Sequence, residues 1–310
     1  MNRILRHRRG FTLVELLVVI AILAVLVGLT GAGIFQWINS QKRRNSENTL
    51  RTVYQTLKSH WSEVVSEARK EPIPTEVMNF AGNDPDRARV IWIKTRLIEA
   101  FPVRYAEVQV ADPYLSYPLR FIPPGKRRYM LSYQAALSGK TSPNDPAIES
   151  SVLLLKSLGM KRGSGPLNAD DLGTATQIKT SDGVRAIVDG WSNSVYFVRF
   201  ATSNAALNAA NPTPNVDPLD PKGTILSSSW SGQPDATVMP SSTKLARITA
   251  WYHAPNGATQ AWYTIPVIAS AGQDGQLGLN SAAAPFDNLG ISNAGQEADN
   301  LYSYKLGGTP

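Results

Sequence analysis

The residues best suited to chemistry stand near the N-terminus, where Gly10 precedes Phe11 and a lone carboxylate, Glu15, precedes an apolar run. Cleavage of the peptide bond after Gly10 would create an ammonium group on Phe11. Phe11 and Glu15 are about one helical turn apart, ~6 Å of rise, so they share a helix face. A carboxylate and an ammonium are each costly in apolar surroundings and tolerable together. The spacing therefore suits an ion pair.

The element that must position these groups is the uncharged segment from Leu16 to Phe35. As a helix its 20 residues (35 − 16 + 1) would span ~30 Å, one hydrocarbon thickness. A basic leader, residues 1–10, precedes it. A secretory signal peptide does not fit, because its apolar core is shorter and a small-residue cleavage site follows it. A plain signal anchor fits the length but leaves Glu15 unexplained, since carboxylates near membrane depth are costly.

The run Arg8-Arg9-Gly10-Phe11-Thr12-Leu13-Val14-Glu15-Leu16 resembles the class III signal of type IV pilins and type II secretion pseudopilins. In that family a membrane peptidase cuts after the glycine, and the new N-terminal residue is N-methylated. The resemblance implies cleavage between Gly10 and Phe11 and N-methylation of Phe11. It also implies that Glu15 pairs with the Phe11 amine of a neighbouring subunit. From the residues alone, Glu15 could instead only cap its own helix, an effect worth ~0.3–1 kcal/mol.

The resemblance further implies a structural subunit, not an enzyme, that polymerises into a type II secretion pseudopilus or a type IV pilus-like filament. The implied partners are a prepilin peptidase and methyltransferase, other pilin or pseudopilin subunits, and an inner-membrane assembly platform. The implied location is the bacterial cytoplasmic membrane, crossed once, with a head in the periplasm or outside the cell. The alternative is a monomeric membrane-anchored surface or adhesion protein that retains the leader.

The helix is expected to continue beyond the membrane. We predict a transmembrane half over residues 11–38 and an amphipathic half over residues 39–70, which ends before Pro72. The apolar positions follow i, i+3, i+4, i+7 spacing and need a partner surface, which we expect to be the sheet of the head. They are Leu50, Val53, Tyr54, Leu57, Trp61, Val64, Val65 and Ala68.

Residues 71–310 read as an α+β head with an antiparallel sheet, because helical patterns come first and strand patterns later. The size of this head favours a minor or specialised subunit. The predicted helices cover residues 84–101 and 145–158, and the predicted strands cover residues 127–133, 184–189, 194–201, 245–252 and 264–270. Between two of these strands, the turn from Asp189 to Ser194 resembles the Asp-x-Trp-Gly-Asn-Pro turn of pseudopilin heads, with Ser192 in place of glycine and Ser194 in place of proline.

An acidic stretch lies near the C-terminus, since no lysine or arginine stands between Arg247 and Lys305. Carboxylates interleaved with glycine and asparagine can wrap a hard cation. The stretch also resembles the calcium-binding C-terminal loop of the major pseudopilin. The resemblance makes Asp274, Glu297 and Asp299 the candidate ligands of a structural Ca²⁺ within residues 266–310. The alternative is a solvated acidic loop without metal.

Composition excludes several other classes. The chain of 310 residues has a formal charge of +7 (31 − 24), and four of these charges are arginines in the leader. The remaining balance of about +3 makes nucleic acid an unlikely partner. The chain has no cysteine and three histidines, which excludes a disulfide framework and thiolate metal sites. No G-x-S-x-G, H-E-x-x-H or G-x-G-x-x-G pattern occurs, so no enzyme is predicted.

Overall fold

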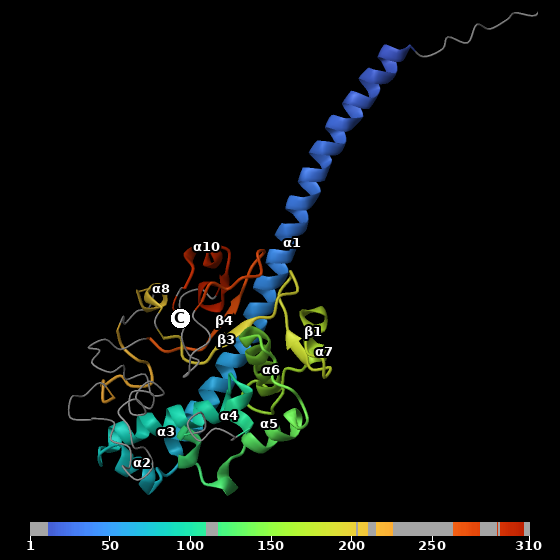
Figure 1. The fold of residues 1–310 in the computed structure, drawn as a ribbon. Helices are drawn as coiled ribbons and strands as arrows, with labels where there is room; N and C mark the ends of the chain where they lie inside the picture. The colour runs from blue at the N-terminus through green and yellow to red at the C-terminus, as the bar shows by residue number, and fades with distance from the viewer. Residues whose placement is uncertain are drawn as a thin grey trace, which may run out of the picture.

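The computed structural model describes residues 12–109, 117–202, 204–209, 215–225, 263–279, 290 and 292–306, without the side chains of residues 29–33, 109, 117–118 and 124. Helix α1 (Leu13–Lys70, 58 residues) dominates its shape. The first half of α1 projects away from the head and the second half is packed into it (Figure 1). The helix ends at Lys70, as predicted, just before Pro72.

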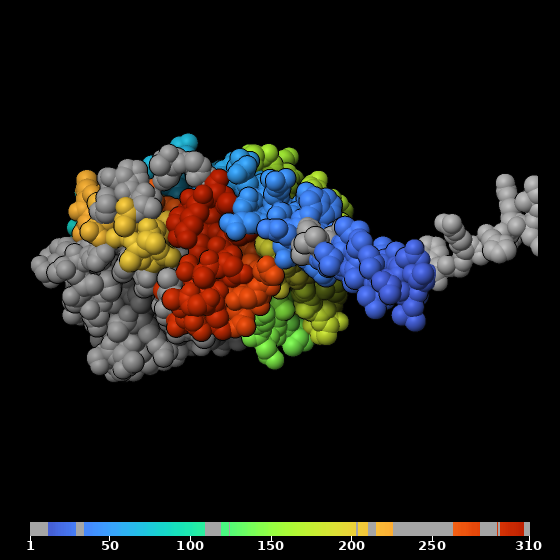
Figure 2. Space-filling model, turned by 90° about the horizontal axis from the view of Figure 1, so that it is seen from above, coloured from blue at the N-terminus to red at the C-terminus, as the bar shows by residue number. Residues whose placement is uncertain are grey.

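The amphipathic half of α1 buries the predicted apolar stripe. Its members from Leu50 to Ala68 are all buried except Tyr54, which is half-buried. The main partner of α1 is helix α3 (Pro85–Ala100), and α1 also contacts α11 (Ser303–Leu306) and strand β4 (Val267–Ser270). The expected packing of α1 on the sheet is therefore only part of its interface with the head. Helix α3 supplies most of the remaining contacts. Seen from above, the C-terminal residues in red lie beside α1 in blue (Figure 2).

Two predicted helices are confirmed, with N-caps that explain where they begin. The Asp84 carboxylate accepts hydrogen bonds from the backbone N–H groups of Asp86 (3.0 Å) and Arg87 (3.1 Å), and α3 begins at the next residue, Pro85. Asp145 accepts from the backbone N–H of Ala147 (2.8 Å) at the start of α6 (Pro146–Leu158). Both α3 and α6 thus begin with an aspartate N-cap followed by a proline, a combination that strongly favours the start of a helix.

The strands of the described residues form two small antiparallel sheets, which confirms the α+β class. Strand β1 (Thr176–Ile178) pairs with β2 (Arg185–Ile187). A second sheet has the order β3 (Tyr196–Val198), β4, β5 (Leu301–Tyr302). The predicted strands over residues 184–189, 194–201 and 264–270 contain β2, β3 and β4. The predicted strand over residues 245–252 lies outside the described residues.

The predicted strand over residues 127–133 is wrong, because this part of the chain begins helix α5 (Met130–Leu137). Met130, Tyr133 and Leu137 are its buried residues, and their spacing of three and four is helical. The Tyr133 hydroxyl donates to the Ala100 carbonyl (2.6 Å), which ties α5 to the end of α3. Elsewhere in the described part of the chain, the helices and 3₁₀ turns are α2 (Thr75–Phe80), α4 (Tyr105–Gln109), η1 (Tyr117–Phe121), η2 (Pro124–Lys126), α7 (Ala169–Leu172), η3 (Gly173–Ala175), α8 (Ala205–Ala209) and α10 (Ala294–Glu297).

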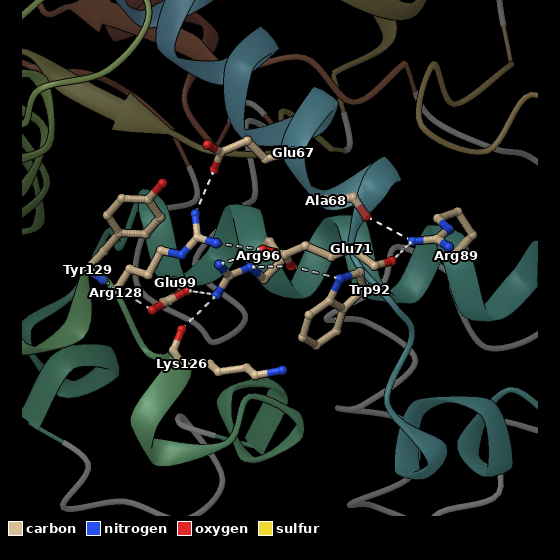
Figure 3. Close-up of polar contacts among 10 residues, drawn as sticks. All are labelled: Glu67, Ala68, Glu71, Arg89, Trp92, Arg96, Glu99, Lys126, Arg128 and Tyr129. Atoms are coloured by element: carbon tan, nitrogen blue, oxygen red, sulfur yellow. Dashed lines mark hydrogen bonds and ion pairs between the residues drawn. The ribbon is translucent and has the colours of Figure 1, made fainter.

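The end of α1 is fastened to α3 by a charged cluster (Figure 3). Arg89 donates to the carbonyl oxygens of Ala68 (2.9 Å) and Glu71 (2.6 Å), so a cation satisfies carbonyls at the helix C-terminus. The Glu71 carboxylate accepts from Arg96 (3.1 Å) and from the Trp92 indole N–H (3.1 Å). These bonds hold the last turn of α1 against α3.

The same cluster contains a buried carboxylate. Glu99 is paired with Arg96 and accepts from the backbone N–H of Tyr129 (3.2 Å). Burial raises the pKa of Glu99, while the charge of Arg96 opposes that rise. Arg128 reaches from the loop before α5 to Glu67 on α1 (3.2 Å). The cluster thus joins α1, α3 and the start of α5.

Candidate assembly site

A capping box opens the long helix. The Thr12 hydroxyl accepts from the backbone N–H of Glu15 (3.2 Å), and the Glu15 carboxylate accepts from the backbone N–H of Thr12 (2.8 Å). The Thr12 hydroxyl also donates to Glu15 Oε2 (2.9 Å). Two of the unsatisfied N–H groups at the helix start are satisfied in this way. The carboxylate of Glu15 therefore lies beside the backbone one residue after Phe11.

Capping by Glu15 is thus present within one chain, and its partner Thr12, although part of the quoted motif, was not predicted as a site residue. The signal for it is the pattern Thr12-Leu13-Val14-Glu15, a threonine three residues before a glutamate at the start of an apolar helix. Pairing of Glu15 with the amine of a second chain stays a prediction. Gly10 and Phe11 lie outside the described residues, so the cleavage position stays a prediction from the sequence.

Apolar side chains cover the projecting half of α1 on all sides. Leu13 is 80% exposed, Phe35 is 71% exposed and Trp37 is 64% exposed. A helix that is apolar all round and uncovered requires lipid or other protein chains around it. The other large apolar side chains exposed on this half are Val14, Leu16, Leu17, Val18, Val19, Ile20, Ile22, Leu23, Val25, Leu26, Val27, Ile34 and Ile38.

Among the residues that the structure describes, no helix combines the length and the apolar character that a bilayer crossing requires. Residue 11 and the side chains of residues 29–33 are outside that description. The transmembrane half over residues 11–38 stays a prediction from the sequence.

The head is joined to α1 at the predicted turn between β2 and β3. The Asp189 carboxylate accepts from the backbone N–H groups of Trp191 (2.9 Å) and Asn193 (2.8 Å) and from the Ser270 hydroxyl (2.7 Å). Burial raises the pKa of Asp189, and these hydrogen bonds oppose the rise. The backbone N–H of Gly190 donates to the hydroxyl of Ser46 on α1 (2.8 Å). The turn thus connects α1 to both sheets.

Two carboxylates of the predicted calcium loop serve its own backbone. Asp299 Oδ2 accepts from the backbone N–H groups of Gln273 (2.7 Å) and Asp274 (3.1 Å). Asp274 Oδ1 accepts from the backbone N–H of Gln276 (2.8 Å). Gly272 has a φ of +67°, and a β-carbon there would meet Asp299 at 2.6 Å, so only glycine fits this approach. The contacts order the loop through hydrogen bonds.

Glu297, the third predicted ligand, lies at the end of α10. Burial raises the pKa of Tyr302 and Tyr304, and the charge of Glu297 adds to the rise. Within the described residues, no group of three or more histidine, aspartate or glutamate side chains is arranged to hold a metal ion. Asp287, the other carboxylate of the stretch, is not among the described residues. Calcium binding therefore stays a prediction.

Comparison with curated proteins and with solved structures found no match for the chain. The match that was found lies at the N-terminus, where the predicted leader and cleavage position precede the capped apolar helix. Residues 5–31 match the family model of the prokaryotic N-terminal methylation motif, and the chain therefore carries the prepilin-type signature.

Proposed function

We propose that this prepilin-type protein is cleaved after Gly10, N-methylated on Phe11 and polymerised through α1 into a filament. The observation that carries the proposal is the uncovered apolar half of α1, which begins with the Thr12–Glu15 capping box inside the methylation motif. In a filament these side chains are buried against other copies of α1. Before assembly, the same segment is expected to anchor the subunit in the cytoplasmic membrane.

Of the two filament classes, we favour a type II secretion pseudopilus. The turn from Asp189 to Ser194 adopts the tight conformation expected from its likeness to the pseudopilin turn, with hydrogen bonds centred on Asp189. Deletion of the gene then leaves secreted enzymes in the periplasm. Loss of surface fibres with normal secretion would instead indicate a type IV pilus-like filament.

The central experiment follows processing and assembly in the native host. Mass spectrometry of the membrane fraction is expected to find methyl-Phe11 as the N-terminus. Shearing and sedimentation are expected to recover the chain in a polymer fraction. Substitution Glu15→Leu should abolish the polymer, whereas Glu47→Leu on the same helix should not. Glu47 is the matched control because its local partner is Arg43, four residues away (3.1 Å).

The competing function is a monomeric membrane-anchored surface protein. An intact Met1 in the mature chain, together with the absence of a polymer fraction, would establish that function and overturn the proposal. Cleaved and methylated chain without polymer would leave processing correct and assembly wrong.

A further inference from the structure

The solvent-facing side of the amphipathic half of α1 carries a straight line of cations. Arg44, Arg51, Lys58 and Arg69 are all exposed, and they are separated by 7, 7 and 11 residues. At 100° per residue these positions fall within about 40° of one another around the helix. We name these four residues the basic row. It extends over ~38 Å along one helix face.

Uncharged residues fill the spaces within the basic row. Asn48, Gln55, Ser62 and Ser66 lie on the same face and are exposed. The nearest acidic residues lie beside this face, and each already has a hydrogen-bond or ion-pair partner. Glu47 pairs with Arg43, Glu67 pairs with Arg128, and Glu63 accepts from the backbone N–H of Gly163.

The basic row itself has few contacts. Arg51 donates to the Leu306 carbonyl at 3.5 Å, a weak bond at the limit of hydrogen-bonding distance. Within the part of the chain that the structure describes, Arg44, Lys58 and Arg69 form no hydrogen bond or ion pair. The acids beside this face are thus occupied by Arg43 of the same helix, by Arg128 and by a backbone N–H group, and the exposed cations give the face a positive potential.

A complementary surface exists on the same chain. Asp274, Glu297 and Asp299, here named the acidic loop, lie in a stretch without lysine or arginine before Lys305. Asp274 is exposed, and the other two are half-buried. Their described contacts are with backbone N–H groups and a tyrosine, so no cation neutralises them there. Lys305 lies over the rings of Tyr302 (4.9 Å) and Tyr304 (5.8 Å).

The acidic loop lies in a part of the chain that also packs against α1. The acidic loop belongs to the C-terminal region, which packs beside α1 through α11 and β4 (Figure 2). Two different patches that complement each other can join copies head to tail, and such a contact can repeat without closing. A filament requires this kind of contact.

We propose that the basic row of one subunit docks against the acidic loop of a second copy of this chain. The inference rests on the proposed polymerisation and adds a contact between the amphipathic half of α1 and a neighbouring head. Its chemistry is ion pairing between guanidinium or ammonium groups and carboxylates at an exposed interface. Such contacts fix register and partner choice.

Charge reversal tests the pairing. The double variant Arg44→Glu/Lys58→Glu is expected to lower polymer yield about tenfold, because like charges then face each other. The matched control Lys156→Glu/Lys161→Glu reverses the same charge on exposed residues of another face and should polymerise normally. Adding Asp274→Lys/Glu297→Lys to the first variant should restore the yield. Thermal unfolding of each variant distinguishes lost assembly from lost folding.

Cross-linking locates the contact directly, because the natural chain contains no cysteine. The variant Gln55→Cys/Gln273→Cys places one thiol in the basic row and one beside Asp274. Oxidation of its filaments should give a ladder of covalent oligomers. The control Gln55→Cys/Ser138→Cys, with the second thiol at the end of α5, should give dimers at most.

The outcomes separate the two proposals. A normal polymer with methyl-Phe11, no ladder and no effect of charge reversal would overturn the docking inference and leave polymerisation intact. No polymer from the parent chain would overturn both. Binding of heparin or DNA to the basic row, lost in Arg44→Glu/Lys58→Glu while polymer yield stays normal, would assign the row to a polyanion and overturn docking to a second copy.

Discussion

Gly190 lies directly against the main chain of Lys42, so closely that a β-carbon on Gly190 would stand 2.1 Å from the Lys42 carbonyl oxygen. The contact joins a turn of the head to the long helix. Position 190 requires glycine because the main chain of Lys42 is so close, and not because of the backbone conformation, since Gly190 is not among the glycines with positive φ. Glycine is needed because any side chain would push the turn away from α1.

Substitution Gly190→Ala is therefore expected to destabilise the head by about 3 kcal/mol, because an added methyl group in a filled space displaces backbone. Denaturant unfolding of the leaderless chain measures the loss. Gly125→Ala is the control, since a β-carbon there meets no atom within 4 Å. Equal stability of the two variants would show that the turn shifts without cost.

The two functions of Glu15 can be separated with Thr12. Thr12→Ala removes the hydroxyl of the capping box and should cost about 1 kcal/mol of helix stability at the first turn. If Glu15 serves a neighbouring subunit, polymer yield in Thr12→Ala stays close to that of the parent and falls only in Glu15→Leu. Equal losses in both variants would mean that capping is the whole role of Glu15.

Ser192 occupies a left-handed conformation with φ of +70°, at the position where the resembled turn has glycine. A side chain costs roughly 1 kcal/mol there, so Ser192→Gly should raise the free energy of unfolding by up to about that amount. Ser192→Ala keeps the strain and loses the contact of the hydroxyl with Gln177 (3.0 Å). A Ser192→Gly variant no more stable than Ser192→Ala would argue against strain at this turn.

His60 is expected to make the stability of the head sensitive to acid. It is buried on α1, and its Nε2–H donates to the Gly165 carbonyl (2.8 Å). Burial lowers the pKa of His60, with the charge of Arg162 acting in the same direction and the hydrogen bond opposing it. Below pH ~6.5, the pKa of histidine in the unfolded chain, His60 becomes protonated in the unfolded state but stays neutral in the folded state. Stability is therefore expected to fall as the pH drops from 6.5 toward the lowered pKa.

Thermal melts at pH values from 8 down to about 5 measure this loss. The variant His60→Gln can still donate to Gly165 and does not titrate, so its melting temperature should change less over that window. Parallel curves for parent and variant would assign the acid sensitivity to other groups. Glu63 and Arg162 are the charged residues to consider around His60.

Calcium binding requires a test on the unsubstituted chain. Asp299→Ala removes a bond that the backbone of the 272–275 turn uses, so that variant loses stability with or without a metal. If the acidic stretch binds Ca²⁺, adding calcium to the leaderless chain raises the melting temperature and a chelator reverses the rise. An unchanged melting temperature, together with no heat of binding in a calcium titration, would contradict the prediction that this stretch binds Ca²⁺.

Local signals in the sequence predicted the frame of the molecule well. The end of α1 before Pro72 and the aspartate caps of α3 and α6 are properties of neighbouring residues. The buried stripe from Leu50 to Ala68 follows from helical spacing alone. These elements are confirmed because each is determined by its own stretch of chain.

Contacts between distant segments were not predictable in the same way. Nothing near Gly190 in the sequence indicates the approach of Lys42, and nothing near Glu71 indicates Arg96. The strand predicted over residues 127–133 failed because that window ends before Leu137, whose position shows the helical spacing. At the candidate site, the capping partner Thr12 was readable from its distance to Glu15, whereas the basic row appears only once the covered face of α1 is known.

The charged cluster at Glu71 and the contact at Gly190 attach the head to helix α1 at two positions along its axis. Ser46 and Glu71 are 25 residues apart (71 − 46), ~38 Å along the helix axis. Two such fixings oppose tilting, whereas a single one would allow the head to rock. A force along α1 is therefore expected to move the head as a rigid body, and both attachments together resist rotation when the head is pushed sideways.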